Sequence, residues 1–127
     1  MELVDSSGWL EYLIDGPNAQ FFARPLLQAD ELVTPTICLY EVFKRVFLEF
    51  GEERALNAVG SMSAGEIVDL NRQIAIDAAQ LSVELKLAMA DSVILATARA
   101  YGATLWTQDA HFKGIDGVEY IEKKAHG

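Results

Sequence analysis

Four acidic side chains fall at positions where a metal-dependent site could form. Asp5 ends the first apolar run of the chain, and Asp109 follows another apolar run near the C-terminus. Asp91 precedes an apolar helical pattern, and Glu41 lies within another. Two carboxylates about 4 Å apart repel by about 4 kcal/mol at an effective dielectric near 20, so a cluster of four requires protonation or a cation. Hard oxygen ligands of this kind select Mg²⁺ or Mn²⁺.

These acids meet only if the chain brings distant segments to one edge. Short β-type runs at 2–5, 32–34, 66–70, 104–107 and 118–121 alternate with helical patterns at 9–13, 18–29, 36–50, 52–62, 72–85 and 91–101. The alternation predicts an α/β fold, a single three-layer α/β/α domain over residues 1–127 with a parallel sheet of four or five strands. The carboxyl ends of such strands share the edge where ligands bind. Glu41, a turn and a half into a helix that begins there, can reach the same cleft.

Each acid also has a purely structural interpretation. Asp5 and Asp91 could cap helices, and Asp109 could be a turn residue. Glu41 lies nearly opposite the apolar stripe of its helix, which runs through Phe43 and Phe50. This position by itself indicates a surface acid paired with Lys44 or Arg45. The individual positions therefore leave both interpretations open, and the cluster depends on their joint arrangement.

The composition excludes several other kinds of site. Ten basic and nineteen acidic residues give a net charge of −9, the wrong sign for an ordinary nucleic-acid binder unless acids gather around a cation. Cys38 is the only cysteine, which excludes an internal disulfide and a cysteine-rich zinc site. His111 follows a turn and His126 lies in the polar tail, so we expect both to be solvated in preference to binding a metal. No apolar run is long enough for a membrane helix and no basic flank marks a signal peptide, so the cytoplasm is the expected location.

Four segments carry acids and hydroxyls in a characteristic order. They are Leu3-Val4-Asp5-Ser6-Ser7, Glu41 in the helix after Val33-Thr34-Pro35, Ala88-Met89-Ala90-Asp91-Ser92-Val93-Ile94-Leu95-Ala96-Thr97-Ala98, and Leu105-Trp106-Thr107-Gln108-Asp109-Ala110-His111-Phe112. Each fragment alone is weakly specific. Their order and spacing, over nearly the whole chain, resemble the PIN domain, and in particular the VapC-type ribonuclease toxins of toxin-antitoxin pairs.

The resemblance implies a metal-dependent RNA endonuclease with Mg²⁺ or Mn²⁺ as cofactor. The residues it assigns to the acidic, metal-binding cluster are Asp5, Glu41, Asp91 and Asp109, and those at accessory hydroxyl positions are Ser6 or Ser7, and Thr107. It further implies an RNA substrate, a cognate antitoxin laid across the acidic cleft, and a homodimer. We expect the aromatic residues of the 36–50 helix, Tyr40, Phe43, Phe47 and Phe50, to belong to the core, although they would also suit a homodimer seam. One departure is Gln108, at a position where members often carry a basic residue. The candidate phosphate contacts elsewhere are Arg24, Lys44, Arg45 and Lys86.

Two other functions are alternatives to the nuclease. A phosphoacceptor signalling module shares the sheet and the acidic edge, but it expects paired acids after the first strand and a lysine after the last, and neither is present. A catalytically silent PIN-like module that binds RNA or protein would be indicated by a missing acid, and all four acids are present.

Overall fold

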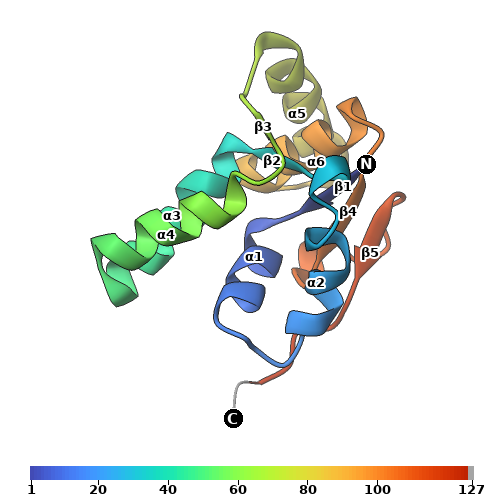
Figure 1. Ribbon diagram of the computed structural model, residues 1–127. Coiled ribbons are helices and arrows are strands. Elements are labelled where there is room, and N and C mark those ends of the chain that lie inside the picture. Colours follow the sequence, from blue (N-terminus) through green and yellow to red (C-terminus); the bar gives the residue numbers. More distant parts are fainter. Residues whose placement is uncertain (126–127) are drawn as a thin grey trace.

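Five short parallel strands run through the centre of the molecule (Figure 1). They are β1 (Glu2–Val4), β2 (Val33–Pro35), β3 (Glu66–Val68), β4 (Thr104–Thr107) and β5 (Val118–Tyr120). This computed structural model describes residues 1–125, so His126 lies outside the described residues. The predicted parallel α/β architecture is confirmed, with one refinement. The strands form a group ordered β1-β4-β5 and a pair β2-β3, linked by a single bridge between Glu2 and Leu32.

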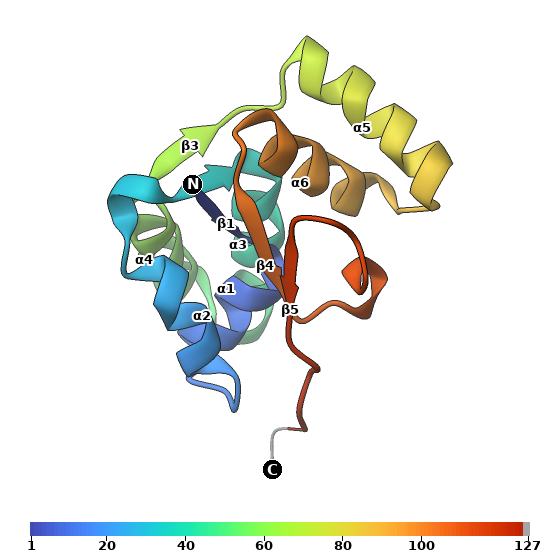
Figure 2. The same ribbon diagram turned by 90° about the vertical axis from the view of Figure 1, so that its right-hand side faces the viewer.

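Six α-helices surround the strands. They are α1 (Ser6–Leu13), α2 (Ala19–Leu26), α3 (Thr36–Phe50), α4 (Glu52–Met62), α5 (Arg72–Leu85) and α6 (Met89–Ala100), with short 3₁₀ helices η1 (Ala29–Glu31) and η2 (Ala110–Phe112). The pairs α1/α2 and α5/α6 lie on opposite sides of the strands (Figure 2). Helices α3 and α4 run side by side and extend away from the strands as a hairpin (Figure 1). In the described part of the chain, no helix has the length and apolar character needed to cross a membrane.

The helix that follows β1 begins earlier than predicted. Sequence patterning placed its start at Trp9, but α1 begins at Ser6 because the Asp5 side chain accepts a hydrogen bond from the backbone N–H of Gly8 at 2.9 Å. Gly8 is required there by packing, since a Cβ atom would lie 2.6 Å from the Phe22 ring. The first turn of α1 is thereby held against α2, directly beside the end of β1.

The start of α6 also differs from the prediction. Asp91 was expected to open this helix, whereas α6 begins at Met89 and the extended residue before it is Ala88. Asp91 therefore lies within the first turn and caps nothing through its side chain. Its carboxylate is left to face the carboxyl edge of the strands.

The buried face of α3 covers only part of the apolar stripe predicted from the sequence, which runs through Leu39, Val42, Phe43, Val46, Phe47 and Phe50. Helix α3 buries Cys38, Val42 and Val46, while Phe47 and Phe50 are 50% and 48% exposed. The buried face is thus rotated toward the side of the helix that carries Glu41. As predicted, Cys38 is a small buried hydrophobe, with no accessible surface.

Candidate active site

One pocket of about 410 Å³ lies at the carboxyl edge of the strands. Its lining includes all four acids singled out in the sequence: Asp5, Glu41, Asp91 and Asp109. They come from the end of β1, the middle of α3, the first turn of α6 and the loop after β4. The tertiary structure therefore brings together residues that lie up to about a hundred positions apart in the chain.

Asp5 is buried and its carboxylate is held by three donors. Its Oδ1 accepts hydrogen bonds from Ser7 Oγ at 2.7 Å and from the Gly8 N–H at 2.9 Å, and its Oδ2 accepts one from Thr107 Oγ1 at 2.5 Å. Burial raises the pKa of Asp5 from 3.8 to about 6, and these hydrogen bonds oppose the rise. Asp5 is thus both the cap of α1 and a fixed member of the pocket, so the two interpretations of the sequence coexist.

Three hydroxyl side chains each donate a hydrogen bond to one of the acids. Ser6 Oγ donates a hydrogen bond to Glu41 Oε1 at 2.6 Å, which joins α1 to α3, while Ser7 Oγ donates one to Asp5. Thr107 Oγ1 donates to Asp5 and accepts a hydrogen bond from the Asp109 N–H at 2.9 Å. The three predicted accessory hydroxyls therefore contact the acids or their backbone directly.

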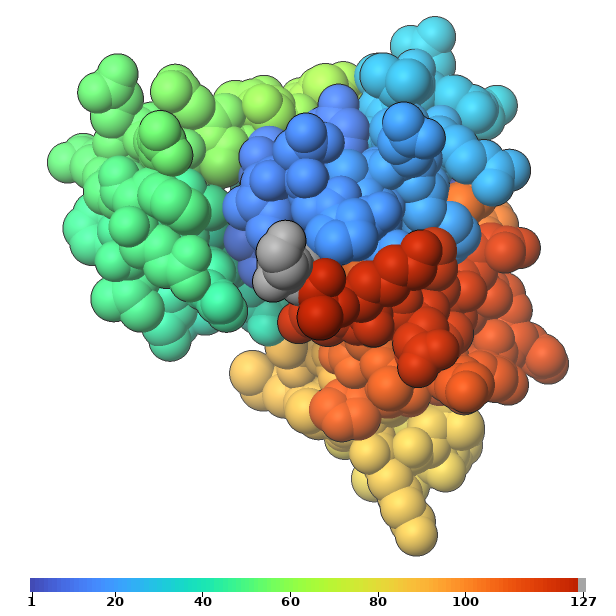
Figure 3. Space-filling model, turned by 90° about the horizontal axis from the view of Figure 1, so that it is seen from below, coloured from blue at the N-terminus to red at the C-terminus, as the bar shows by residue number. Residues whose placement is uncertain are grey.

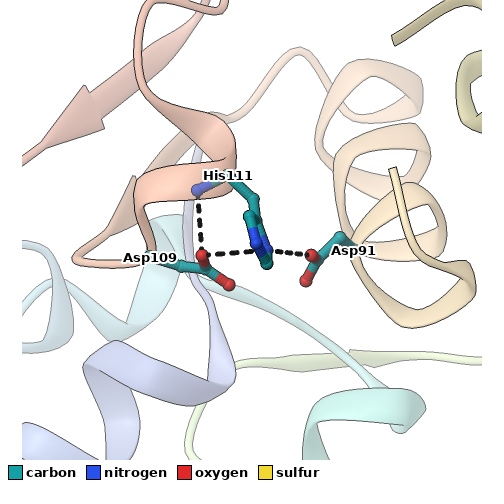
Figure 4. Close-up of side chains that lie close together, drawn as sticks. All are labelled: Asp91, Asp109 and His111. Atoms are coloured by element: carbon teal, nitrogen blue, oxygen red, sulfur yellow. Dashed lines mark hydrogen bonds and ion pairs between the residues drawn. The ribbon is translucent and has the colours of Figure 1, made fainter. Parts of the chain in front are cut away.

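Asp91 and Asp109 face each other across the imidazole of His111 (Figure 4). His111 Nδ1 lies 3.4 Å from Asp91 Oδ2 and 3.2 Å from Asp109 Oδ1. Burial raises the pKa of Asp91 above its usual range, and the nearby charge of Asp109 acts in the same direction, while His111 opposes both. The His111 side chain is 72% exposed, as expected for a solvated residue, but its contacts with both acids were not foreseen. The one feature of the sequence that indicates these contacts is the position of His111 two residues after Asp109.

Gln108 has a structural role that the sequence did not reveal. Its side chain is buried, accepts a hydrogen bond from Asn18 Nδ2 at 3.0 Å and donates one to Glu11 Oε1 at 3.5 Å. Glu11, which is also buried and was missed in the sequence, accepts from the Asn18 N–H at 2.8 Å. These three residues connect the end of β4 to α1 and to the turn before α2. The polar residue at position 108 thus fixes the loop that carries Asp109.

Of the four basic side chains proposed as phosphate contacts, one lines the pocket. Arg45 does so, together with Lys123, which the sequence analysis did not select. Arg24 lies 5.6 Å from the centre of the Trp106 ring, Lys44 lies over Tyr40, and Lys86 ends α5 in a left-handed conformation.

Two acids of the pocket and the neighbouring imidazole of His111 could together hold a divalent cation. Asp91, Asp109 and His111 each offer a ligand atom, and these atoms lie within 4.8 Å of one another. Burial and like charge disfavour the ionised forms of Asp5 and Asp91, and a divalent cation would relieve that cost. The residues present therefore fit a divalent cation.

Comparison with known proteins identifies the family. The family model described as PIN domain matches residues 3–118. No curated protein matches the sequence significantly.

Solved structures extend the likeness to the whole chain. A toxin-antitoxin complex from Klebsiella pneumoniae contains a chain with 26% identity and a TM-score of 0.76, with 94% of this chain and 96% of that one covered. A chain of DNA-bound VapBC from Salmonella typhimurium has 23% identity and a TM-score of 0.76, with 96% of this chain and 98% of that one covered. VapC20 from Mycobacterium tuberculosis is described as a Sarcin-Ricin loop cleaving toxin. It has 16% identity and a TM-score of 0.76, with 98% of this chain and 100% of that one covered. With the family match and the shared fold, this chain belongs to the PIN domain family.

Proposed function

We propose that this protein is a Mg²⁺- or Mn²⁺-dependent endoribonuclease and the toxin of a toxin-antitoxin pair. The observation that carries the proposal is the convergence of Asp5, Glu41, Asp91 and Asp109 on one pocket. A purely structural role would not require four acids from four elements to meet, because their mutual repulsion is costly without a cation. The family membership and the VapC-like fold point to the same chemistry.

Each acid has a proposed role. Asp5, Asp91 and Asp109 would hold one or two divalent ions, and Glu41 would be a further ligand or would orient the attacking water. When bound, a divalent ion supplies an activated water and offsets charge on the scissile phosphate and the leaving oxygen. Ser6, which donates to Glu41 at 2.6 Å, fixes the direction of that carboxylate in either role.

RNA would approach the pocket past its two basic residues. Arg45 lies one helical turn after Glu41, and Lys123 follows β5. Arg45 is held by Glu49, with its Nε 2.5 Å from Glu49 Oε1, on the exposed side of α3. We propose that these two cations position the phosphate backbone, and that the acids supply the local attraction through the metal despite the overall charge of −9.

We further propose a cognate antitoxin, a homodimer and a cytoplasmic location. Two of the similar structures are described as a toxin-antitoxin complex and as VapBC, which supports an antitoxin partner for this chain. An arginine inserted among the carboxylates would neutralise them and exclude the metal. The exposed aromatic face of α3 supports a homodimer, and the cytoplasm is where an RNA-cleaving toxin meets its substrate.

The decisive experiment is cleavage of total RNA by the purified protein, verified free of inhibitor, with Mg²⁺, with Mn²⁺ and with EDTA. We expect cleavage with either metal and none with EDTA. Asp91→Asn should lower the cleavage rate by about 100-fold or more, because it removes a metal ligand that caps no helix.

The matched control is Asp116→Asn, which changes an exposed acid that does not line the pocket and should leave cleavage unchanged. Circular dichroism should show that both variants fold. If the wild-type protein cuts no RNA with either metal, the catalytically silent binding module becomes the better explanation.

A further inference from the structure

The imidazole of His111 is held in place by the same carboxylate that it faces. Asp109 accepts a hydrogen bond from the His111 backbone N–H at 2.9 Å and thereby caps the short helix η2. This cap directs the imidazole back over Asp109 and toward Asp91, with Nδ1 between the two acids (Figure 4). The nitrogen therefore lies beside two of the acids that line the pocket, Asp91 and Asp109, although most of the His111 side chain is exposed.

The distances around Nδ1 match those between neighbouring ligands of one metal ion. Two adjacent ligands at about 2.1 Å from an octahedral ion lie about 3.0 Å apart. Nδ1 lies 3.2 Å from Asp109 Oδ1 and 3.4 Å from Asp91 Oδ2. A small adjustment of either side chain would place all three atoms around one centre.

We propose that His111 is a nitrogen ligand of the divalent ion held by Asp91 and Asp109, and that the pocket consequently prefers Mn²⁺ or Co²⁺ to Mg²⁺. The inference rests on the proposed function, since it concerns the ion of the same pocket. Imidazole favours first-row transition metals, whereas Mg²⁺ is bound through carboxylates and water. The remaining ligands would be oxygens from the acids and water.

The competing arrangement is a histidine that merely bonds to the acids and leaves when the ion enters. The two arrangements differ in one measurable property, which is a bond between Mn²⁺ and an imidazole nitrogen. Pulsed electron paramagnetic resonance detects the coupling of Mn²⁺ to a bonded nitrogen. Histidine labelled with ¹⁵N distinguishes this nitrogen from any backbone amide.

The experiment uses the whole chain loaded with Mn²⁺ at one equivalent. We expect a ¹⁵N-histidine coupling in the wild-type protein and its loss in His111→Gln. His126→Gln is the matched control, since His126 is the other histidine of the sequence, and it should keep the coupling. In titrations, His111→Gln should weaken Mn²⁺ binding by about tenfold and change Mg²⁺ binding, measured by competition, by less than about twofold.

The outcomes separate this inference from the function on which it rests. Tight Mn²⁺ binding without histidine coupling, unchanged in His111→Gln, would overturn the nitrogen ligand but leave the nuclease standing. A coupling that disappears only in His126→Gln would overturn it as well. Absence of Mn²⁺ binding to the wild-type pocket would remove both proposals.

Discussion

At the scale of single residues, the same side chains both cap helices and line the pocket. Asp5 caps α1 through Gly8 and is also turned toward the pocket by Thr107. Asp109 Oδ1 likewise caps η2 through the His111 backbone N–H and also lies 3.2 Å from the Nδ1 of the same residue. Two alternatives that appear exclusive in the sequence are therefore compatible, because a carboxylate has two oxygens and about four acceptor positions.

The burial of Asp5 predicts a pH dependence of stability in the metal-free protein. Its pKa of about 6 in the folded chain lies above the unfolded value of 3.8, so the folded state binds more protons between these values. Unfolding free energy should then fall as pH rises from about 4 to about 6, by at most about 3 kcal/mol from this group. Asp91 contributes with the same sign, since its pKa is also raised.

Urea denaturation in EDTA across this pH range measures the effect. Asp5→Asn should flatten the decrease while retaining most of the stability, because asparagine also caps helices well. The same variant should abolish RNA cleavage. An Asp5→Asn protein that is unfolded at ambient temperature would mean that the hydrogen-bonded Asp5 carboxylate has a mainly structural role.

At the scale of elements, α1 is the part against which the acids are aligned. From α1, Ser6 donates a hydrogen bond to Glu41 on α3, and Ser7 donates one to Asp5 at the end of β1. Glu11, also on α1, accepts a hydrogen bond from Gln108, which follows β4. Gly16, in the turn after α1, leaves room for the Glu11 carboxylate, since a Cβ atom there would lie 2.6 Å from it. The site is therefore sensitive to changes that shift α1 against β4.

Gln108→Leu tests that connection. The substitution removes the hydrogen bonds from Asn18 and to Glu11 within a buried region, which should lower the unfolding free energy by about 1 to 3 kcal/mol. Cleavage should fall less than in Asp91→Asn, since no acid is removed.

Thermal or urea unfolding gives the measurement, and Gln80→Leu on the exposed side of α5 is the control expected to change stability little. Equal stability of the Gln108→Leu and Gln80→Leu proteins would show that the network does not hold the loop.

At the scale of the whole molecule, the α3–α4 hairpin forms an arm beside the compact body (Figure 3). Its outer face carries an apolar groove of about 540 Å³, lined by Leu39, Tyr40, Phe43, Lys44, Phe47, Leu48 and Val59. Leu48 is 79% exposed and Phe47 stacks on Phe43 with 5.6 Å between ring centres. Contiguous apolar surface of this kind is typical of an interface.

Leu48→Glu should therefore convert the proposed homodimer into a monomer, because it places a charge in the apolar contact. Sedimentation velocity of the purified protein measures the change. Val83→Glu is the matched control, since Val83 is 80% exposed on α5 and away from the groove. A wild-type protein that sediments as a monomer throughout the micromolar range would contradict the dimer.

Much of this arrangement was determined by the sequence itself. Strand and helix periodicity predicted parallel α/β order, and the position of Asp5, Asp91 and Asp109 at element ends placed them on one edge, because parallel strands share a carboxyl edge. Such features depend on local spacing and on topology alone. The resemblance then connected them with a known acidic cluster.

Only the tertiary structure decided how the remaining groups face the pocket. Glu41 turns inward because α3 buries Cys38 together with the two valines of the predicted stripe, Val42 and Val46, and leaves the aromatic end of that stripe exposed. The surfaces packed against α3 decide this. Gln108 turns inward because Glu11 and Asn18 offer buried partners there. Helical and strand periodicity report that a residue lies on a face, but which face is covered depends on contacts between segments distant in the chain.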